Sequence, residues 1–260
     1  MEDINGMRRL IFIILICCAA FLAASAGWVW SAEPADLTLD PAAMNVNTFF
    51  SGGQLTVSGE IPAADDVVVE IIGPAANSLF NLKGRIGPFW MTRDKVELEN
   101  APGLYMLLMP AGQEWENKAA GLGLGVDNLK QRISIGKSAE PTDRVFTMFV
   151  KLKKSEGLYG ETSGAVTYAT AENSAKRFTA RAVLPSSTAV GVYQIKATVM
   201  EQGAVVRTLQ HDFVVQEVGF VKMVNELASN RRLVFGVSAV LIALFAGAVM
   251  GFIFKGGGGH

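Results

Sequence analysis

Two uncharged stretches of membrane-spanning length, one near each end, constrain the fold of this chain more than any other feature of its sequence. The C-terminal stretch runs from Leu233 to Phe254. As a helix it would be roughly 33 Å long, which is enough to cross a bilayer core of about 30 Å. We therefore predict a transmembrane helix over residues 233–254 and a short cytoplasmic tail over residues 255–260.

Two glycines in this predicted span, Gly247 and Gly251, are four residues apart. Small residues at this spacing allow a membrane helix to pack closely against a second helix. A plain lipid-facing anchor is the alternative, because small residues are common in single spans.

The N-terminal stretch has the three parts of a secretory signal. Two arginines precede an apolar segment that begins at Leu10, and Ala24-Ser25-Ala26 has the small residues of a cleavage site. We predict a signal peptide over residues 1–26. An uncleaved anchor reaching residue 32 is the alternative, because the uncharged run continues beyond the cleavage site.

An export signal followed by a C-terminal stop-transfer helix places the residues between them outside the cytoplasm. We expect the main domain, residues 33–218, to be periplasmic or extracellular. Arg231 and Arg232 on the outer side run mildly against the positive-inside rule, which a long translocated domain weakens. Both cysteines, Cys17 and Cys18, lie in the signal, so the exported domain has no disulfide and no thiolate chemistry.

The exported domain reads as mainly β. Apolar and polar residues alternate in eight segments, as they do in half-buried strands. The last two segments are joined by a glycine hairpin and resemble the closing strands of immunoglobulin-like domains. We predict an immunoglobulin-like β-sandwich whose strands include Gln54–Glu60, Val67–Ile72, Lys95–Leu98, Leu104–Met109, Val166–Thr170, Arg177–Leu184, Val192–Glu201 and Val205–Val215.

Helical patterns interrupt and follow these strands. Apolar residues recur at helical spacing between Pro141 and Gly157, with proline at the start and glycine at the end. We predict an α-rich insertion at about residues 113–158, with a boundary between two subdomains as the alternative. We also predict a juxtamembrane helix over residues 219–232 that continues into the membrane.

The sequence offers little to enzyme chemistry. A formal net charge of −1 excludes a generally basic nucleic-acid binder. The exported domain has one histidine, His211, and the segment Gly121–Gly125 lacks the Lys-Ser/Thr of a phosphate loop. No nucleophile, base and orienting group can be assembled. We therefore expect a non-enzymatic protein with no cofactor and no metal site.

The charged and aromatic residues indicate candidate binding sites. Residues 33–127 carry 13 acidic and 5 basic side chains, whereas residues 128–230 carry 9 acidic and 13 basic ones. The basic excess indicates an anion site or a dock for an acidic partner, with a solvated helix face as the alternative. A second hypothesis is a small anion or peptide pocket, with a core tryptophan and a surface ion pair as its alternative. The candidate binding residues are Trp90, Arg93, Tyr105, Lys151, Lys153 and Lys154.

Five stretches, the last of which continues through the C-terminal span, carry a resemblance to known proteins. They are FWMTRDKVELENAPGLYMLL (89–108), GLGVDNLK (123–130), FVKLKKSEGLYGE (149–161), FTARAVLPSSTAVGVYQIKATVMEQGAVV (178–206) and FVVQEVGFVKMVNELASNRRLVFGVSAVLIALFAGAVMGFIFK (213–255). In these stretches the chain resembles a family of uncharacterised bacterial transmembrane proteins first delineated in alphaproteobacteria. Thr92 stands where the family pattern has Asn, a mild departure. The resemblance implies a protein of the bacterial inner membrane whose main domain is periplasmic.

The resemblance implies a signal, an extracytoplasmic domain and one C-terminal span, often encoded beside a permease of the sulfite-exporter (TauE/SafE) type. It supplies no catalytic residues. The leading hypothesis is therefore a membrane-anchored accessory protein of a multi-span permease for small sulfur-containing anions. An anion-binding or sensing module is the second hypothesis, and an envelope structural protein is the third.

Overall fold

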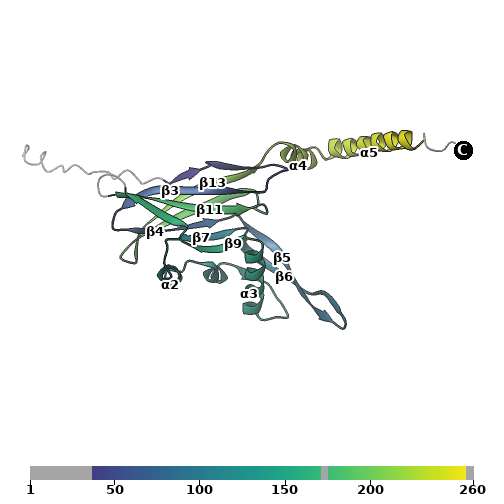
Figure 1. Cartoon of the computed structure of the whole chain (residues 1–260). Coiled ribbons are helices and arrows are strands. Elements are labelled where there is room, and N and C mark those ends of the chain that lie inside the picture. The colour runs from purple at the N-terminus through teal and green to yellow at the C-terminus, as the bar shows by residue number, and fades with distance from the viewer. Residues whose placement is uncertain (1–36, 171–174, 256–260) are drawn as a thin grey trace, which may run out of the picture. The chain divides into compact units, whose positions relative to one another are not determined.

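The computed structural model describes residues 37–170 and 175–255. Its architecture is mainly β with one apolar C-terminal helix, as predicted, and Figure 1 shows how the elements are arranged. The signal peptide over residues 1–26, the alternative anchor to residue 32 and the tail after Lys255 lie outside the described residues. The immunoglobulin-like identity of the sandwich stays a prediction.

One sheet has four antiparallel strands in the order β1-β3-β11-β10. Their inward side chains alternate with exposed ones, because successive residues of a strand point to opposite faces. The buried set on the two long strands is Leu55, Val57, Ile61, Phe178, Ala180, Ala182 and Leu184. The strand bounds are β1 (Thr38–Asp40), β3 (Gly52–Pro62), β11 (Ala175–Pro185) and β10 (Val166–Thr170).

The second sheet has six strands in the order β2-β13-β12-β4-β7-β9. On β12 the alternation predicted from the sequence is confirmed, since Tyr193, Ile195, Ala197 and Val199 are all buried. Two pairs, β13 with β2 and β7 with β9, are parallel. The bounds are β2 (Ala43–Val46), β13 (Ala204–Glu217), β12 (Gly191–Glu201), β4 (Asp66–Ile72), β7 (Tyr105–Met109) and β9 (Tyr159–Ser163).

A helical crossover joins the parallel strands β7 and β9. Parallel neighbours need such a connection, because the chain must return to the same end of the sheet. It consists of α2 (Glu114–Gly121), the 3-10 helix η1 (Val126–Gln131), β8 (Ser134–Ile135) and α3 (Thr142–Ser155). These elements all fall within the predicted insertion at residues 113–158. The apolar face of α3 is buried through Val145, Phe146, Phe149 and Val150.

A long hairpin, which the sequence did not reveal, forms the third sheet. Its strands are β5 (Ala75–Ile86) and β6 (Phe89–Pro102), and β8 pairs with the inner part of β6. We predicted only residues 95–98 as a strand here. Most of β5 is exposed on both faces, so it lacks the apolar alternation that marks a half-buried strand. Figure 1 shows the hairpin extending away from the two larger sheets.

The chain ends in two helices, α4 (Phe220–Asn230) and α5 (Arg232–Lys255). We predicted one helix running from residue 219 into the membrane, and the structure instead breaks it at Arg231, whose φ of −132° and ψ of 55° are not helical. Among the described residues, one helical stretch, Arg232–Phe252, is long and apolar enough to cross a membrane. Its side chains do not pack into the β domain, since none of its most apolar window is buried.

Candidate functional site

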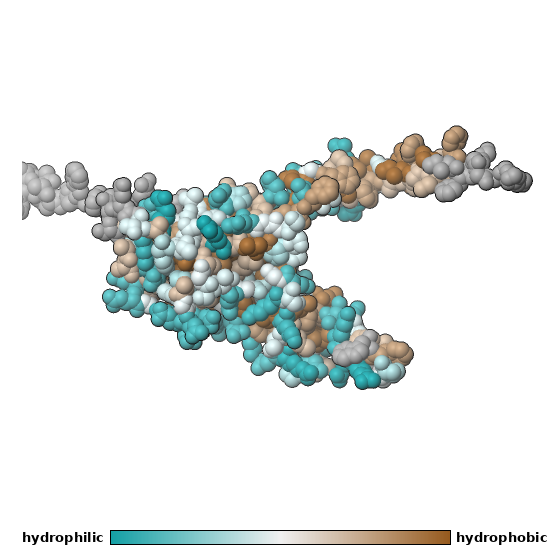
Figure 2. All heavy atoms as spheres, viewed as in Figure 1, coloured by the Kyte–Doolittle hydropathy of each residue, from teal (hydrophilic) through white to brown (hydrophobic). Residues whose placement is uncertain are grey.

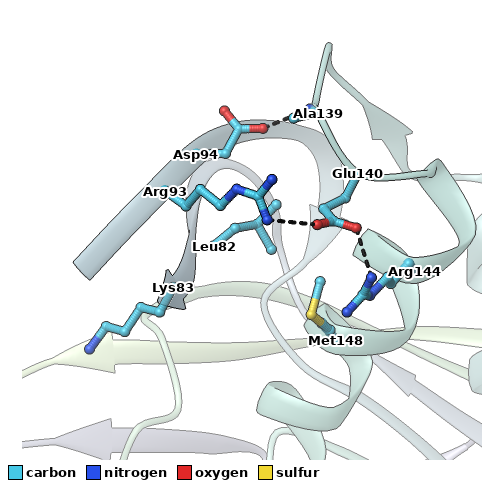
Figure 3. A pocket seen from close by; sticks show the side chains of 9 residues that line it. Leu82, Lys83, Arg93, Asp94, Ala139, Glu140, Arg144 and Met148 are labelled. Atoms are coloured by element: carbon cyan, nitrogen blue, oxygen red, sulfur yellow. Dashed lines mark hydrogen bonds and ion pairs between the residues drawn. The ribbon is translucent and has the colours of Figure 1, made fainter. Parts of the chain in front are cut away.

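A pocket of about 190 Å³ lies between the β5–β6 hairpin and the segment that leads into α3 (Figure 3). Its centre is a carboxylate between two guanidinium groups. Glu140 Oε2 accepts a 3.0 Å hydrogen bond from Arg144 Nη1, and Glu140 Oε1 lies 3.7 Å from Arg93 Nη1. Leu82 and Met148 add apolar lining. The pocket therefore contains one of the predicted binding residues, Arg93.

A second carboxylate, that of Asp94, holds two sides of this pocket together. Asp94 Oδ2 accepts hydrogen bonds from the backbone N–H of Ala139 at 2.9 Å and from Ser138 Oγ at 3.0 Å. These two bonds, with a third from Lys95 N–H, hold the pKa of Asp94 below its usual value. Asp94 therefore ties the segment before α3 to the hairpin.

The charge of the pocket is only partly balanced. Arg93 has 60% of its side chain exposed, and its nearest carboxylate contact is longer than a hydrogen bond. Lys83 borders the pocket, but its ammonium group points away from the two arginines (Figure 3). An anion can therefore meet two guanidinium groups here, but it competes with Glu140 for them and also meets the negative charge of Asp94.

The two aromatic candidates lie on different strands, and Tyr105 does not line the pocket that contains Arg93. Trp90 lies on β6, as Arg93 does, opposite Arg85 in the β5–β6 register. Tyr105 is 1% exposed on β7, and its hydroxyl donates a 2.7 Å hydrogen bond to Glu70 Oε1. The same hydroxyl accepts a 2.8 Å hydrogen bond from Gly125 N–H. Tyr105 is thus bonded within the protein, away from Arg93, and its predicted binding role receives no geometric support.

The Tyr105 hydroxyl lies in a buried layer between the six-stranded sheet and the crossover. Burial raises its pKa above the usual value, and the adjoining Glu70 raises it further. Gly125 has a φ of +105°, and a Cβ there would lie 2.8 Å from Glu161 Oε1. Glu161 Oε1 accepts a 2.6 Å hydrogen bond from Val126 N–H. The glycine-rich segment Gly121–Gly125 therefore leads into hydrogen-bonded contacts with β7 and β9.

The three lysine candidates lie near the C-terminus of α3. Lys151 and Lys154 are exposed. Lys153 lies 3.5 Å from Glu156 and 5.8 Å from the centre of the Phe149 ring. Cations at this end of a helix interact favourably with its dipole, so a structural role accounts for them. Their predicted role in anion binding stays a prediction.

The outer part of the hairpin carries a surface that sequence reasoning missed. Phe89 and Met91 lie beside the turn, alternate along β6 and are 68% and 47% exposed. We call these two residues the hairpin patch. Leu79 is 67% exposed but pairs with Glu97, nearer the base of the hairpin, and is not part of this patch. Figure 2 shows apolar colour at the outer end of the hairpin and along α5, whereas the sandwich surface is mostly hydrophilic. The signal was present in FWM at residues 89–91, a short apolar run at a turn.

Two further predictions concern the span and metal sites. Gly247 and Gly251 lie on α5, and a Cβ at either would meet nothing within 4 Å. Space is therefore available for a second helix, and packing there stays a prediction. In the part of the chain that the structure describes, no group of three or more His, Cys, Asp or Glu is arranged to hold a metal ion.

A β-rich domain followed by one exposed apolar helix of spanning length defines a membrane-anchored protein. The chain belongs to the family described as "Putative transmembrane protein (Alph_Pro_TM)", whose family model matches residues 36–256. That match covers every described element from β1 to α5. No curated protein matches the chain.

Proposed function

We propose that this protein is a non-enzymatic accessory subunit, anchored in the bacterial inner membrane by α5, with its β domain in the periplasm. Its partner is a multi-span permease of the sulfite-exporter type that handles small sulfur-containing anions. The observation that carries the proposal is the hairpin patch. Exposed apolar side chains gathered on a protruding element are typical of a protein-binding surface.

The hairpin is also built to hold its position. Its base is closed by hydrogen bonds from Gly73 N–H to Leu104 O at 2.7 Å and from Gly103 N–H to Pro74 O at 2.9 Å. Higher up, Phe80 packs edge-on against Phe149 of α3 at 5.9 Å between ring centres. A patch fixed in this way loses little conformational entropy when a partner binds.

Co-purification from gently solubilised membranes tests the proposal. We expect the wild-type chain to bring a multi-span permease with it, and the double variant Phe89→Ser, Met91→Ser to lose it. The control, Val205→Ser with Val206→Ser, removes two exposed apolar side chains from β13 and keeps the permease. Recovery of peptidoglycan or outer-membrane components in place of a permease, or a double variant of the hairpin patch that retains the permease, overturns the proposal.

A second candidate function, an anion-binding or sensing module, is favoured by the two guanidinium groups that converge on Glu140. Such groups bind sulfite, sulfate and sulfonates through charge-assisted hydrogen bonds. Since Glu140 occupies the same donors, its neutral variant binds these anions more tightly than the wild type.

Calorimetric titration of the detergent-solubilised chain with sulfite, sulfate and a sulfonate tests this candidate. We expect Glu140→Gln to strengthen binding and Arg93→Ala to abolish it. Arg181→Ala, an exposed arginine on β11, is the matched control and leaves binding unchanged. Flat titrations for both the wild type and Glu140→Gln exclude the candidate.

A further inference from the structure

Helix α4, Phe220–Asn230, is amphipathic along its whole length. At 100° per residue, the apolar side chains fall on one face and the polar ones on the other. Lys222 and Glu226 form an ion pair of 3.8 Å on the polar face, together with Asn225 and Ser229. The apolar face consists of Phe220, Val221, Met223, Val224, Leu227 and Ala228.

The apolar face of α4 has no place in the protein core. No residue of α4 is buried, and none packs against the core cluster of the described domain. Phe220 and Met223 are 65% and 56% exposed. Val221, Val224, Leu227 and Ala228 are half-buried, so the apolar face is only partly covered in the described structure. On the polar face, Asn225 Nδ2 donates a 2.6 Å hydrogen bond to Glu217 Oε2 at the end of β13, and Lys222, Glu226 and Ser229 are exposed.

The position of α4 in the chain indicates what covers this face. α4 ends at Asn230, and the candidate span begins at Arg232. Two residues bridge only about 7 Å, so the end of α4 lies at the membrane surface whatever the orientation of the β domain. The non-helical Arg231 separates the two helices, so α4 need not continue along the axis of α5.

Charge at the junction fits the same location. Arg231 and Arg232 follow the last turn of α4, and Lys222 precedes them on its polar face. Arginine side chains at such a depth reach phosphate groups, while an apolar helix face enters the upper acyl chains by about 5–10 Å.

We propose that α4 is an interfacial membrane helix: it lies on the outer surface of the bilayer, with its apolar face in the lipid and its polar face away from the lipid. The occupant of this face is the lipid surface itself. The proposal rests on α5 as the anchor and not on any permease partner. The proposal for α4 therefore holds even if no permease partner is found, and the permease proposal holds even if α4 does not lie in the membrane surface.

Spin-label accessibility in lipid nanodiscs tests the proposal on the full chain. Cys17 and Cys18 are replaced by serine, and single cysteines are then introduced along α4 for labelling. The apolar-face series is Phe220→Cys, Met223→Cys, Val224→Cys and Leu227→Cys, and the polar-face control series is Lys222→Cys, Glu226→Cys and Ser229→Cys.

We expect labels of the apolar series to be accessible to oxygen, which dissolves in the bilayer, and shielded from a water-soluble nickel chelate. The control series shows the opposite preference, so the ratio oscillates with a period of about 3.6 residues. Equal nickel accessibility on both faces overturns the proposal, because α4 then lies in water. Shielding of the apolar series from both reagents also overturns it, because the face is then covered by protein.

Discussion

The hydroxyl of Tyr105 on β7 donates a 2.7 Å hydrogen bond to the carboxyl group of Glu70 on β4, and both side chains are buried. Their strands are neighbours in the six-stranded sheet, and the pair lies under the helical crossover. Gly125 N–H completes the group by donating to the same hydroxyl. The pair thus joins two strands of the sheet to the segment between α2 and η1.

Tyr105→Phe leaves two buried polar groups, on Glu70 and Gly125, without this partner. We expect a loss of about 1–3 kcal/mol in the free energy of unfolding. Urea unfolding of the detergent-solubilised chain, followed by tryptophan fluorescence, measures it. The control is Tyr168→Phe, because the hydroxyl of Tyr168 is only part-buried and water can replace it. A larger loss in the control than in Tyr105→Phe contradicts the account.

All four tyrosines of the chain resist ionisation in the folded state. Burial raises the pKa of Tyr168 and Tyr193 to about 12, and it also raises the pKa of Tyr105 and Tyr159. The raised pKa favours the neutral phenol in the folded state. The contribution of these tyrosines to stability is therefore fully present below pH about 10 and is lost as the pH rises toward 12. Ultraviolet absorbance of tyrosinate should show no step near pH 10. A step there in protein that is still folded would contradict the burial of these side chains.

The link between the hairpin and the segment before α3 should weaken in acid. Because Asp94 has a lowered pKa in the fold, its contribution is present above the usual value of about 3.8 and is lost as the pH falls through the lower folded value. Amide exchange at Ala139, corrected for the intrinsic effect of pH, should lose protection in that window. In Asp94→Asn, the protection of the Ala139 amide should be lower than in the wild type above this window, and it should not change with pH within the window. Equal pH dependence in both proteins would assign the change to another group.

Gly73→Ala should destabilise the base of the hairpin. A Cβ at this position would lie 2.8 Å from Leu104 N and 3.0 Å from Tyr193 Cε1, so backbone must move. We expect a loss of about 1–3 kcal/mol, measured by urea unfolding. Gly160→Ala on β9 is the matched strand control. Its Cβ would meet nothing within 4 Å, so its stability should stay the same or rise by up to about 1 kcal/mol.

Phe149→Ala should loosen α3 from the sheet. The Phe149 ring packs edge-on against Phe80 at 5.9 Å and Tyr159 at 5.8 Å between ring centres. Removing a buried phenyl ring costs about 3–5 kcal/mol, which thermal unfolding by near-ultraviolet circular dichroism can detect. Leu152→Ala on the same helix, at a side chain 42% exposed, should change stability by only about 0.5 kcal/mol. Equal losses would mean that α3 is not held by this cluster.

The site followed from the sequence only in part. Arg93 was singled out as a binding candidate, and it lines a pocket with Arg144 and Glu140. Arg144 was counted only as part of the basic excess after residue 128, and Glu140 escaped notice. Both lie about 50 residues from Arg93 along the chain, and no local pattern joins them to it. Tyr105 was grouped with Arg93 because it follows the next turn, yet β7 directs it under the crossover.

The sequence by itself determined the apolar span, the main strands and the presence of helix between residues 113 and 158. Each of these follows from the local pattern of apolar residues, which indicates whether a side chain faces the protein core or the lipid. Only the tertiary structure decided that β5 and β6 form an extended hairpin, that Tyr105 meets Glu70, and that α4 is separate from α5 at Arg231. These outcomes depend on which distant segments pack together and on a single backbone conformation, and neither leaves a periodic trace in the sequence.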